Sequence, residues 1–250
     1  MPPALVPLPG QWLVALLIHL PLPLLARPIP LLTAAGWRHA ALLGALLWGS
    51  LGWRGWLAVV IYLILGSLVT RLGLRQKQAQ GLAEARGGRR GPENVWGSAL
   101  VGAVLAVVTP LAPQHGQPLL LLAFAASFAA KLADTFGSEI GKRWGRHARL
   151  ISTGRRVPPG TEGAISLEGT AASLGGSALM TLTMAVLGLI SGMGAITLVV
   201  AVGLLATLLE SLIGATLQQR WPWLSNEVVN GLQTLAAAGL ALLLAPLAVG

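Results

Sequence analysis

Cysteine is absent from the chain, and charged residues are scarce. Without cysteine the protein can form no disulfide, no thiol nucleophile and no Cys-ligated metal site. Charged residues make up 10% of the 250 residues, whereas a soluble domain carries about a quarter. Hydrophobic residues make up 54%, and they gather in stretches of about 20 residues, the length that crosses a bilayer. These features exclude an ordinary soluble enzyme and predict an all-α, polytopic transmembrane helical bundle.

Acidic residues are few: 8 Asp and Glu stand against 17 Lys and Arg, which gives a net charge of +9. An excess of this kind can indicate nucleic-acid binding. Here the sequence has no surface of interleaved aromatic and basic residues, and too little soluble chain to build one. Basic loops in a membrane protein more often report its orientation. We therefore predict the lipid bilayer as a partner and no nucleic acid.

The apolar stretches predict about eight spans, within a range of six to eight, in one integral-membrane domain over residues 1–250. The start, "MPPALVPLPGQW", lacks the basic region of a cleavable signal peptide, so we expect the first segment to be a retained span. Residues 1–73 hold generic spans, and 74–235 hold the expected catalytic helices and two basic loops. The predicted spans are 11–26, 34–52, 55–73, 96–111, 118–140, 165–190, 195–217 and 228–247.

Two polar stretches, 74–95 and 141–164, are rich in Lys and Arg. When the chain is threaded through eight spans, every Lys and Arg except Arg54 and Lys131 falls on one side or its boundary. By the positive-inside rule this side is cytoplasmic, or stromal in a plastid. Both termini then face the opposite side.

A polar stripe runs along one expected helix, residues 127–142. At 100° per residue, six polar side chains fall within an arc of about 100°, with Glu139 at its edge. An internal Lys131–Asp134 pair that helps the bundle pack would explain two of them, but not the rest. Ionisable groups in a bilayer cost about 2.5–3.5 kcal/mol each, so they indicate function. The six are Ser127, Lys131, Asp134, Thr135, Ser138 and Lys142.

The acids lie beside the basic stretches, a pattern typical of a magnesium–polyphosphate site. Mg²⁺ takes hard oxygen ligands, usually one or two carboxylates plus substrate phosphates, while Arg and Lys neutralise the remaining phosphate charge. Orientation alone would explain the basic residues but not the acids, which contribute little to topology. The acids in or beside the last four spans are Asp134, Glu139, Glu162, Glu168, Glu210 and Glu227.

A Gly-rich loop, "VPPGTEGAISLEGTAASLGG" (157–176), follows the second basic stretch. Loops of this kind that enter a helix can offer backbone N–H groups to phosphate. Thr161, Gly163 and Ser166 are the candidates. An ordinary loop with a helix N-cap explains Thr161 or Ser166 equally well when each is taken singly.

The segments "ADTFGSEIGKR" (133–143), "RLISTGRRVPPGTEGAISLEGTAAS" and "GLAEARGGRRGPENVWGSA" (81–99) resemble the integral-membrane family that contains plant and cyanobacterial phytyl-phosphate kinase. The resemblance covers roughly residues 70–235. More distantly, the chain is similar to phytol kinase, dolichol kinase and CDP-diacylglycerol synthase. These relatives imply Mg²⁺ and a nucleoside triphosphate, often CTP. The chain has Glu162 and Glu168 where CDP-diacylglycerol synthases carry aspartates.

The resemblance implies a Mg²⁺-dependent kinase that converts phytyl phosphate to phytyl diphosphate for tocopherol and prenyl-lipid synthesis. Asp134 is the first predicted metal ligand, followed by Glu139, Glu168 and Glu162; Asp134, Glu139 and Lys131 are the predicted catalytic residues. The predicted phosphate- and nucleotide-binding residues are Arg89, Arg90, Asn94, Lys142, Arg143, Arg155, Arg156, Thr161, Gly163 and Ser166. The candidate polar contacts are Ser138, Glu210, Asn226, Glu227 and Asn230, of which the two asparagines serve equally well as interhelical hydrogen-bond partners.

Two other functions stay open at this stage. An ion-coupled transporter would bind ions near the bilayer midplane through Lys131, Asp134 and Glu210. A CTP-using cytidylyltransferase acting on a lipid phosphate would release pyrophosphate instead of CDP. The resemblance implies a plasma or thylakoid membrane of a cyanobacterium-like cell, or a plastid envelope. The sequence leaves open the donor nucleotide, the length of the isoprenoid and whether the protein forms an oligomer.

Overall fold

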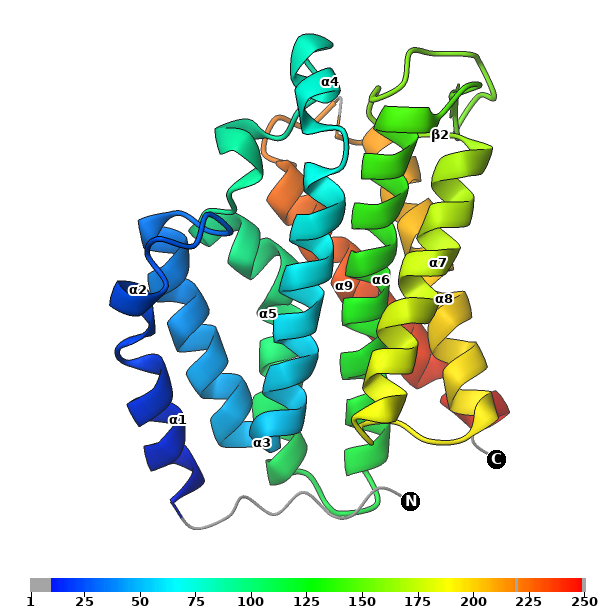
Figure 1. Cartoon of the computed structure of the whole chain (residues 1–250). Helices are drawn as coiled ribbons and strands as arrows, with labels where there is room; N and C mark the ends of the chain where they lie inside the picture. Colours follow the sequence, from blue (N-terminus) through cyan, green and yellow to red (C-terminus); the bar gives the residue numbers. More distant parts are fainter. Residues whose placement is uncertain (1–9, 219, 249–250) are drawn as a thin grey trace.

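The computed structural model describes residues 10–218 and 220–248, and residues 1–9, where the sequence predicts no cleavable signal, lie outside them. The described chain is an all-α bundle with one short two-stranded sheet (Figure 1). Six of its helices are long and apolar enough to cross a membrane, which confirms the predicted polytopic fold. The helices are α1 Gln11–His19, α2 Leu22–Leu25, α3 Ala34–Arg71, α4 Leu74–Ala79, α5 Pro92–Val108, α6 Gln117–Trp144, α7 Leu167–Val186, α8 Met193–Thr216 and α9 Asn226–Ala248, with 3₁₀ turns η1 Ala85–Gly88 and η2 Thr109–Leu111.

Helix α3 contains two of the predicted spans. Its 38 residues are interrupted at Gly52, whose φ of 69° and ψ of −169° are not helical. Glycine adopts this left-handed φ without the steric cost that a side chain would add. The two halves run in opposite directions (Figure 1), so the predicted segments 34–52 and 55–73 are the two arms of a helical hairpin. The predicted span 11–26 is divided into α1 and α2 near Pro21 and Pro23 and is shorter than the others.

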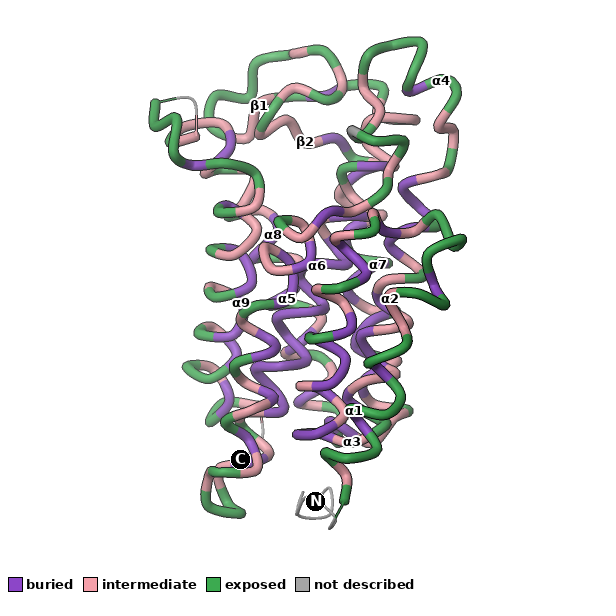
Figure 2. The backbone as a smooth tube through the Cα atoms, turned by 90° about the vertical axis from the view of Figure 1, so that its left-hand side faces the viewer, coloured by how far each residue is buried: buried purple, intermediate pink, exposed green. Residues whose placement is uncertain are grey.

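Helix α6 lies in the middle of the bundle (Figure 1). In its most apolar 18-residue stretch 78% of the residues are buried, against 28–39% in the other five long helices. Small residues allow this close packing: a Cβ on Gly137 would lie 2.0 Å from the Ser173 hydroxyl of α7. Buried residues are concentrated inside the bundle, while exposed residues lie in the loops above it and along the outer faces of the helices (Figure 2). Any polar side chain on α6 must therefore face another helix or an internal cavity.

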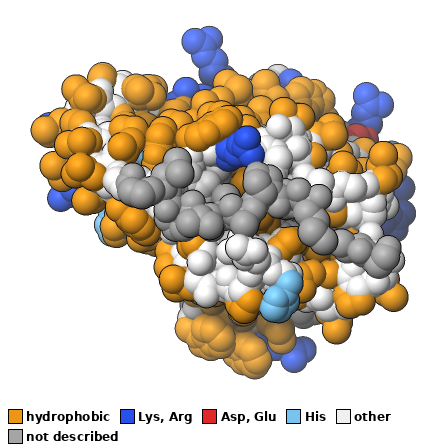
Figure 3. All heavy atoms as spheres, turned by 90° about the horizontal axis from the view of Figure 1, so that it is seen from below, with side chains coloured by type: hydrophobic (Ala, Val, Ile, Leu, Met, Phe, Trp, Pro, Cys, Tyr) orange, Lys and Arg blue, Asp and Glu red, His pale blue; other side chains and the backbone are white. Residues whose placement is uncertain are grey.

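The two ends of the bundle differ. At one end lie α4, η1 and the hairpin of β1 (Arg149–Leu150) and β2 (Ala164–Ile165), which pair antiparallel. These elements come from the two basic stretches. The first and last described residues lie at the opposite end (Figure 1). Seen from that end, hydrophobic side chains cover most of the surface that is described, and only a few Lys, Arg, Asp or Glu side chains are visible (Figure 3). The basic loops therefore gather at one end of the bundle, as the sequence predicts. That this end faces the cytoplasm or stroma stays a prediction of the positive-inside rule.

Cysteine labelling tests this orientation directly, because the chain has no native cysteine. Ser152 lies exposed in the hairpin at the basic end, and Ser191 lies exposed in the turn between α7 and α8 at the opposite end. We expect a membrane-impermeant maleimide to label Ser152→Cys only from the cytoplasmic side and Ser191→Cys only from the other side. The reverse pattern would show that the orientation is inverted.

Candidate active site

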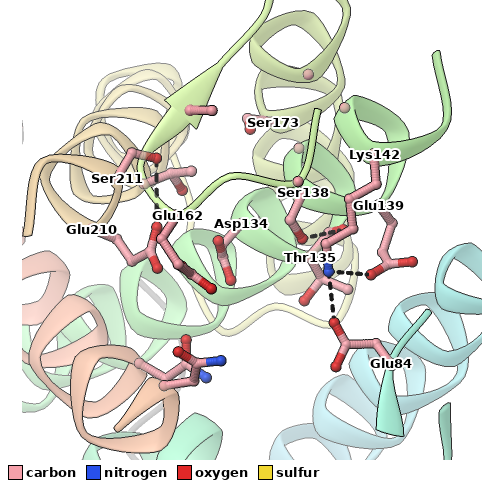
Figure 4. A pocket seen from close by; sticks show the side chains of 18 of the residues that line it. Glu84, Asp134, Thr135, Ser138, Glu139, Lys142, Glu162, Ser173, Glu210 and Ser211 are labelled. Carbon is pink, nitrogen blue, oxygen red and sulfur yellow. Dashed lines mark hydrogen bonds and ion pairs between the residues drawn. The ribbon is translucent and has the colours of Figure 1, made fainter. Parts of the chain in front are cut away.

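A polar cavity of about 390 Å³ opens among the helix ends and loops at the basic end. Its lining begins at Thr70, at the end of α3, and extends to Asn230 in the second turn of α9. Side chains of both signs meet there (Figure 4). The cations on the lining are Arg86, Arg89, Arg90, Lys131 and Lys142, and the acids are Glu84, Asp134, Glu139, Glu162, Glu210 and Glu227.

The polar stripe of α6 forms one wall of the cavity. Lys131, Asp134, Thr135, Ser138 and Lys142 all line it. The helix periodicity thus predicted correctly which face of α6 is polar. The sixth member of the stripe, Ser127, lies deeper, where its hydroxyl donates to the Phe124 carbonyl at 2.8 Å. Only the part of the polar face near the basic end of the bundle lines the cavity.

Three carboxylates converge on one side of the cavity: Asp134 from α6, Glu162 from the Gly-rich loop and Glu210 from α8 (Figure 4). Burial raises the pKa of the Glu162 carboxyl; attraction to Lys142 opposes this shift, and repulsion from Asp134 adds to it. The Ser211 hydroxyl lies 3.5 Å from Glu210 Oε2. Among the described residues, no three His, Cys, Asp or Glu side chains lie close enough together to hold a metal ion by themselves.

Lys131 sits beneath these acids and is 5% exposed. Its ammonium donates to Asp134 Oδ2 and, at 2.7 Å, to Asn230 Oδ1 of α9. The pair of Lys131 and Asp134 expected from the i, i+3 spacing is therefore present. Asp134 Oδ1 is outside that pair, so the aspartate can be held by Lys131 and still present an oxygen to the cavity.

Glu139 has different neighbours from the other acids. Its carboxylate accepts from Lys77 and Lys142 and points away from Asp134 (Figure 4). The sequence grouped Glu139 with Asp134 as a metal ligand because both lie near the same face of α6. The structure places Lys77, from α4, against Glu139, and this contact joins residues 62 positions apart.

Arg90 is held on the lining by both its backbone and its side chain. Its backbone is bridged to the segment before α3: Arg90 N donates to Leu31 O at 3.1 Å, and Arg90 O accepts from Thr33 N at 3.0 Å. Its guanidinium donates to the Tyr62 hydroxyl at 3.0 Å and stacks over the Tyr62 ring. It also fills the space beside Gly66, where an added Cβ would lie 2.6 Å from Arg90 Nη2.

Three of the helices that begin at this end of the bundle start beside the cavity: α5, α7 and α9. Residues near each of their N-termini line the cavity, and helix N-termini favour anions because their N–H groups and dipoles point outward. Ser166 is the N-cap of α7 and accepts from Gly169 N at 3.1 Å. Asn94 Oδ1 accepts from Gly91 N at 2.9 Å, and its Nδ2 donates to Glu227 at 3.2 Å. Asn226 accepts from Gln218.

The Gly-rich loop is held against α8. Gly163 has a φ of +71°, and a Cβ there would lie 2.4 Å from the Ala215 backbone nitrogen, so only glycine fits without a shift. Thr161 closes the Pro-Pro-Gly turn through its hydroxyl, which donates to the Pro158 carbonyl at 2.7 Å. Both residues line the cavity. The loop is thus a rigid wall that carries Glu162.

Four predicted site residues lie outside the lining. Arg155 and Arg156 are exposed on the outer part of the hairpin. Arg143 stacks on Trp144, with its guanidinium carbon 5.0 Å from the ring centre. Glu168 is half-buried in the first turn of α7. Their positions do not bring them to the acids and cations that meet in the cavity.

This difference gives a test of the two basic loops. We expect the double change Arg155→Gln, Arg156→Gln to alter the Kd for inorganic pyrophosphate by less than about twofold, because exposed charges away from a site contribute little. The matched change Arg89→Gln, Arg90→Gln should raise this Kd by about tenfold or more, because it removes charge-assisted hydrogen bonds from the lining. Equilibrium binding of radiolabelled pyrophosphate to purified protein compares the two. Equal losses of affinity would show that Arg155 and Arg156 also belong to the anion-binding site.

Several lining residues were not among the predicted site residues. Glu84 and Arg86 lie in the first basic stretch, from which only Arg89, Arg90 and Asn94 were predicted as phosphate-binding residues. The hydroxyls of Thr170, Ser173 and Ser211 also line the cavity. Serine and threonine are common in membrane helices, so the sequence did not identify these three as site residues. The i, i+3 spacing of Thr170 and Ser173 behind the N-cap could have placed both on the face that meets α6.

Comparison with known proteins decides the family. Residues 17–238 match the family described as integral membrane protein DUF92. The chain belongs to this family. A chloroplastic relative, protein VTE6 of Arabidopsis thaliana, is 42% identical over 203 residues, which is 80% of this chain and 61% of VTE6. An uncharacterized membrane protein of Synechocystis sp. is 50% identical over 92% of this chain and 90% of its own length.

A further relative is also a membrane protein. An uncharacterized membrane protein of Methanocaldococcus jannaschii is 31% identical over 92% of this chain and 93% of its own length. No solved structure matches the chain. Membership of the DUF92 family confirms the resemblance that the sequence motifs predict, and it establishes an integral membrane protein.

Proposed function

We propose that the protein is a membrane-bound prenyl-phosphate kinase that transfers a phosphoryl group from a nucleoside triphosphate, with CTP favoured, to phytyl phosphate. The observation that carries the proposal is the cavity: five cations, six acids and three helix N-termini meet at the basic end of a membrane bundle. This composition suits a polyphosphate with its metal. The family resemblance supplies the prenyl substrate and the tocopherol pathway.

The surroundings of the cavity suit an amphipathic substrate. Exposed Leu205, Leu209 and Leu212 on α8 and exposed Leu232 and Leu235 on α9 face outward from the helices that carry the site. In a membrane these side chains meet lipid, where an isoprenoid tail is soluble. A phosphate at the head of such a tail would reach the cavity from the bilayer while the nucleotide enters from water.

The donor set fits Mg²⁺, which prefers hard oxygen ligands and usually binds through one or two carboxylates together with substrate phosphates. Asp134 would hold it together with substrate phosphates, and Glu162 or Glu210 would supply a second carboxylate, since both line the same side of the cavity (Figure 4). Glu210 takes the place of the predicted Glu139 and Glu168 in this proposal because its carboxylate faces Asp134. When bound, the ion would neutralise phosphate charge. Because no three acids among the described residues lie close enough to hold an ion by themselves, phosphate oxygens of the nucleotide would complete its coordination.

Phosphoryl transfer requires positioning and charge neutralisation rather than a covalent protein nucleophile. In the proposed reaction a phosphate oxygen of phytyl phosphate bonds to the γ-phosphorus, and the bond from that phosphorus to the β-phosphate oxygen breaks. The nucleoside diphosphate leaves with the electron pair. Arg90, Arg89 and Lys142 would bind phosphate oxygens, and Lys131 would orient Asp134 through the contact described above.

Two other functions predict different products. A cytidylyltransferase would attack the α-phosphorus of CTP and release pyrophosphate. A transporter would release neither product, and its ion site would lie near the midplane, whereas this cavity lies at one end of the bundle.

Product identification tests the proposal. Purified protein in detergent is incubated with phytyl phosphate, Mg²⁺ and radiolabelled CTP, and the products are separated. We expect phytyl diphosphate and CDP. Pyrophosphate with a CMP-linked lipid would show a cytidylyltransferase, and the absence of any transfer with CTP, ATP, GTP or UTP would contradict a kinase.

A further inference from the structure

A chain of ion pairs runs from the protein interior to the rim of the cavity. Lys77 and Glu139 are 1% and 3% exposed. The Lys77 ammonium donates to Glu139 and, at 2.7 Å, to the Thr70 carbonyl. Thr70 lies in the last turn of α3, where backbone carbonyls lack partners within the helix. Lys77 therefore joins its own helix, α4, to the end of α3 and to Glu139 of α6.

Charges alternate along the rest of this chain. Glu139 Oε1 lies 3.4 Å from the Lys142 ammonium, which in turn lies 2.8 Å from Glu84 Oε1. Exposure rises outward, from 3% at Glu139 to 20% at Lys142 and 50% at Glu84. Lys142 ends in the cavity between the two acids (Figure 4). Lys142 thus has one buried partner, Glu139, and one solvent-accessible partner, Glu84.

We propose that Glu139 and Lys77 are positioning residues, which hold the Lys142 ammonium where it binds a substrate phosphate, and that Glu84 occupies that phosphate's place until it arrives. This inference rests on the proposed function. Both oxygens of Glu139 face lysine ammonium groups, so a metal ion there would meet two positive charges. The solvent-exposed contact of Lys142 with Glu84 is the weaker kind of ion pair, and a phosphate, with more charge and more acceptor oxygens, displaces it.

The alternation of charge predicts how single changes act. In Lys77→Met the buried Glu139 keeps Lys142 as its partner and draws it away from the cavity. In Glu139→Gln the Lys77 charge is left buried without its carboxylate, which is unfavourable, and Lys142 loses its inner anchor. The double change Lys77→Met, Glu139→Gln removes both buried charges together. Its effect on phosphate binding should therefore be smaller than the sum of the effects of the two single changes.

Equilibrium binding of radiolabelled inorganic pyrophosphate, measured without Mg²⁺, reports the affinity of the Lys142 site for phosphate independently of turnover. We expect Glu84→Gln to tighten binding about threefold or more, because the competing carboxylate is gone. Glu139→Gln and Lys77→Met should each weaken binding about tenfold. The double change Arg146→Gln, Glu84→Gln restores the net charge by removing an exposed arginine outside the lining, and it should keep the tightening.

Glu84→Gln decides the case even if the buried variants do not fold, because Glu84 is exposed at the rim. Unchanged or weaker pyrophosphate binding in Glu84→Gln would overturn the inference. For folded Glu139→Gln the Mg²⁺ concentration that gives half-maximal transfer should stay unchanged; a higher value with normal pyrophosphate binding would make Glu139 a metal ligand instead. Absence of phosphoryl transfer by the native protein would contradict the proposed function. The comparison of pyrophosphate binding among the variants would still test the role of Glu84, Glu139 and Lys77.

Discussion

Asp134→Asn is expected to lower kcat by about 100-fold or more, because removal of a charged group that stabilises a transition state costs that much. The amide keeps the shape of the side chain and removes its charge. The oxygen that faces Glu162 and Glu210 would then attract a cation only weakly, and the orientation set by Lys131 would be lost. Phosphoryl transfer at saturating Mg²⁺ measures the loss. Retention of most activity there would exclude a metal-binding role for Asp134.

A companion variant separates chemistry from folding. Asp134→Asn leaves the buried Lys131 without its acid, although Asn230 still accepts from it at 2.7 Å. The double change Lys131→Gln, Asp134→Asn removes both charges, so its thermal unfolding should lie closer to that of the native protein. Activity should remain low in both variants. Recovery of activity in the double variant would show that Asp134 serves only to neutralise Lys131.

Arg90→Gln is the second change with a large expected effect: an increase in the KM for prenyl phosphate or nucleotide of about 10- to 100-fold, since a positioned charged contact is lost. Gly66→Val should produce much of the same loss without touching a charge. The added side chain would occupy the space that the Arg90 guanidinium fills. The guanidinium would then leave the Tyr62 hydroxyl and its place on the lining.

Gly175→Val is the matched control for Gly66→Val. It adds a side chain to a glycine of the transmembrane helix α7 where nothing lies within 4 Å. Its KM values should equal those of the native protein. If Gly66→Val also leaves KM unchanged, the position of Arg90 does not matter for substrate binding, and Arg89 or Lys142 must supply the phosphate contacts.

The features that depend on local pattern could be predicted from the sequence. Apolar length identifies the spans, and even the hairpin within α3 follows from the break near Gly52. Helix periodicity correctly placed Lys131, Asp134 and Ser138 on one polar face. The resemblance of the motifs to a known membrane family was confirmed by the match to DUF92.

The features that depend on distant neighbours could not be predicted in this way. Glu139 lies at the edge of the polar arc, and whether it faces the metal-binding acids or a lysine depends on Lys77, which arrives from another segment. Arg155 precedes the Pro-Pro-Gly turn, but the pairing of β1 with β2 carries it outward. Glu210 looked isolated in an apolar helix because its partners are brought to it by α6 and by the Gly-rich loop.

The contact of Lys131 with Asp134 also bears on how the protein is made. Asn230 lies 99 residues later in the chain, so α6 is synthesised and reaches the membrane before this partner exists. Asp134, one turn away on the same helix, is available from the start. Because an ion pair within one helix lowers the cost of carrying a lysine into lipid, α6 brings its own counterion for the interval before α9 emerges from the ribosome. The same aspartate would thus assist the biogenesis of the bundle before it serves the finished site.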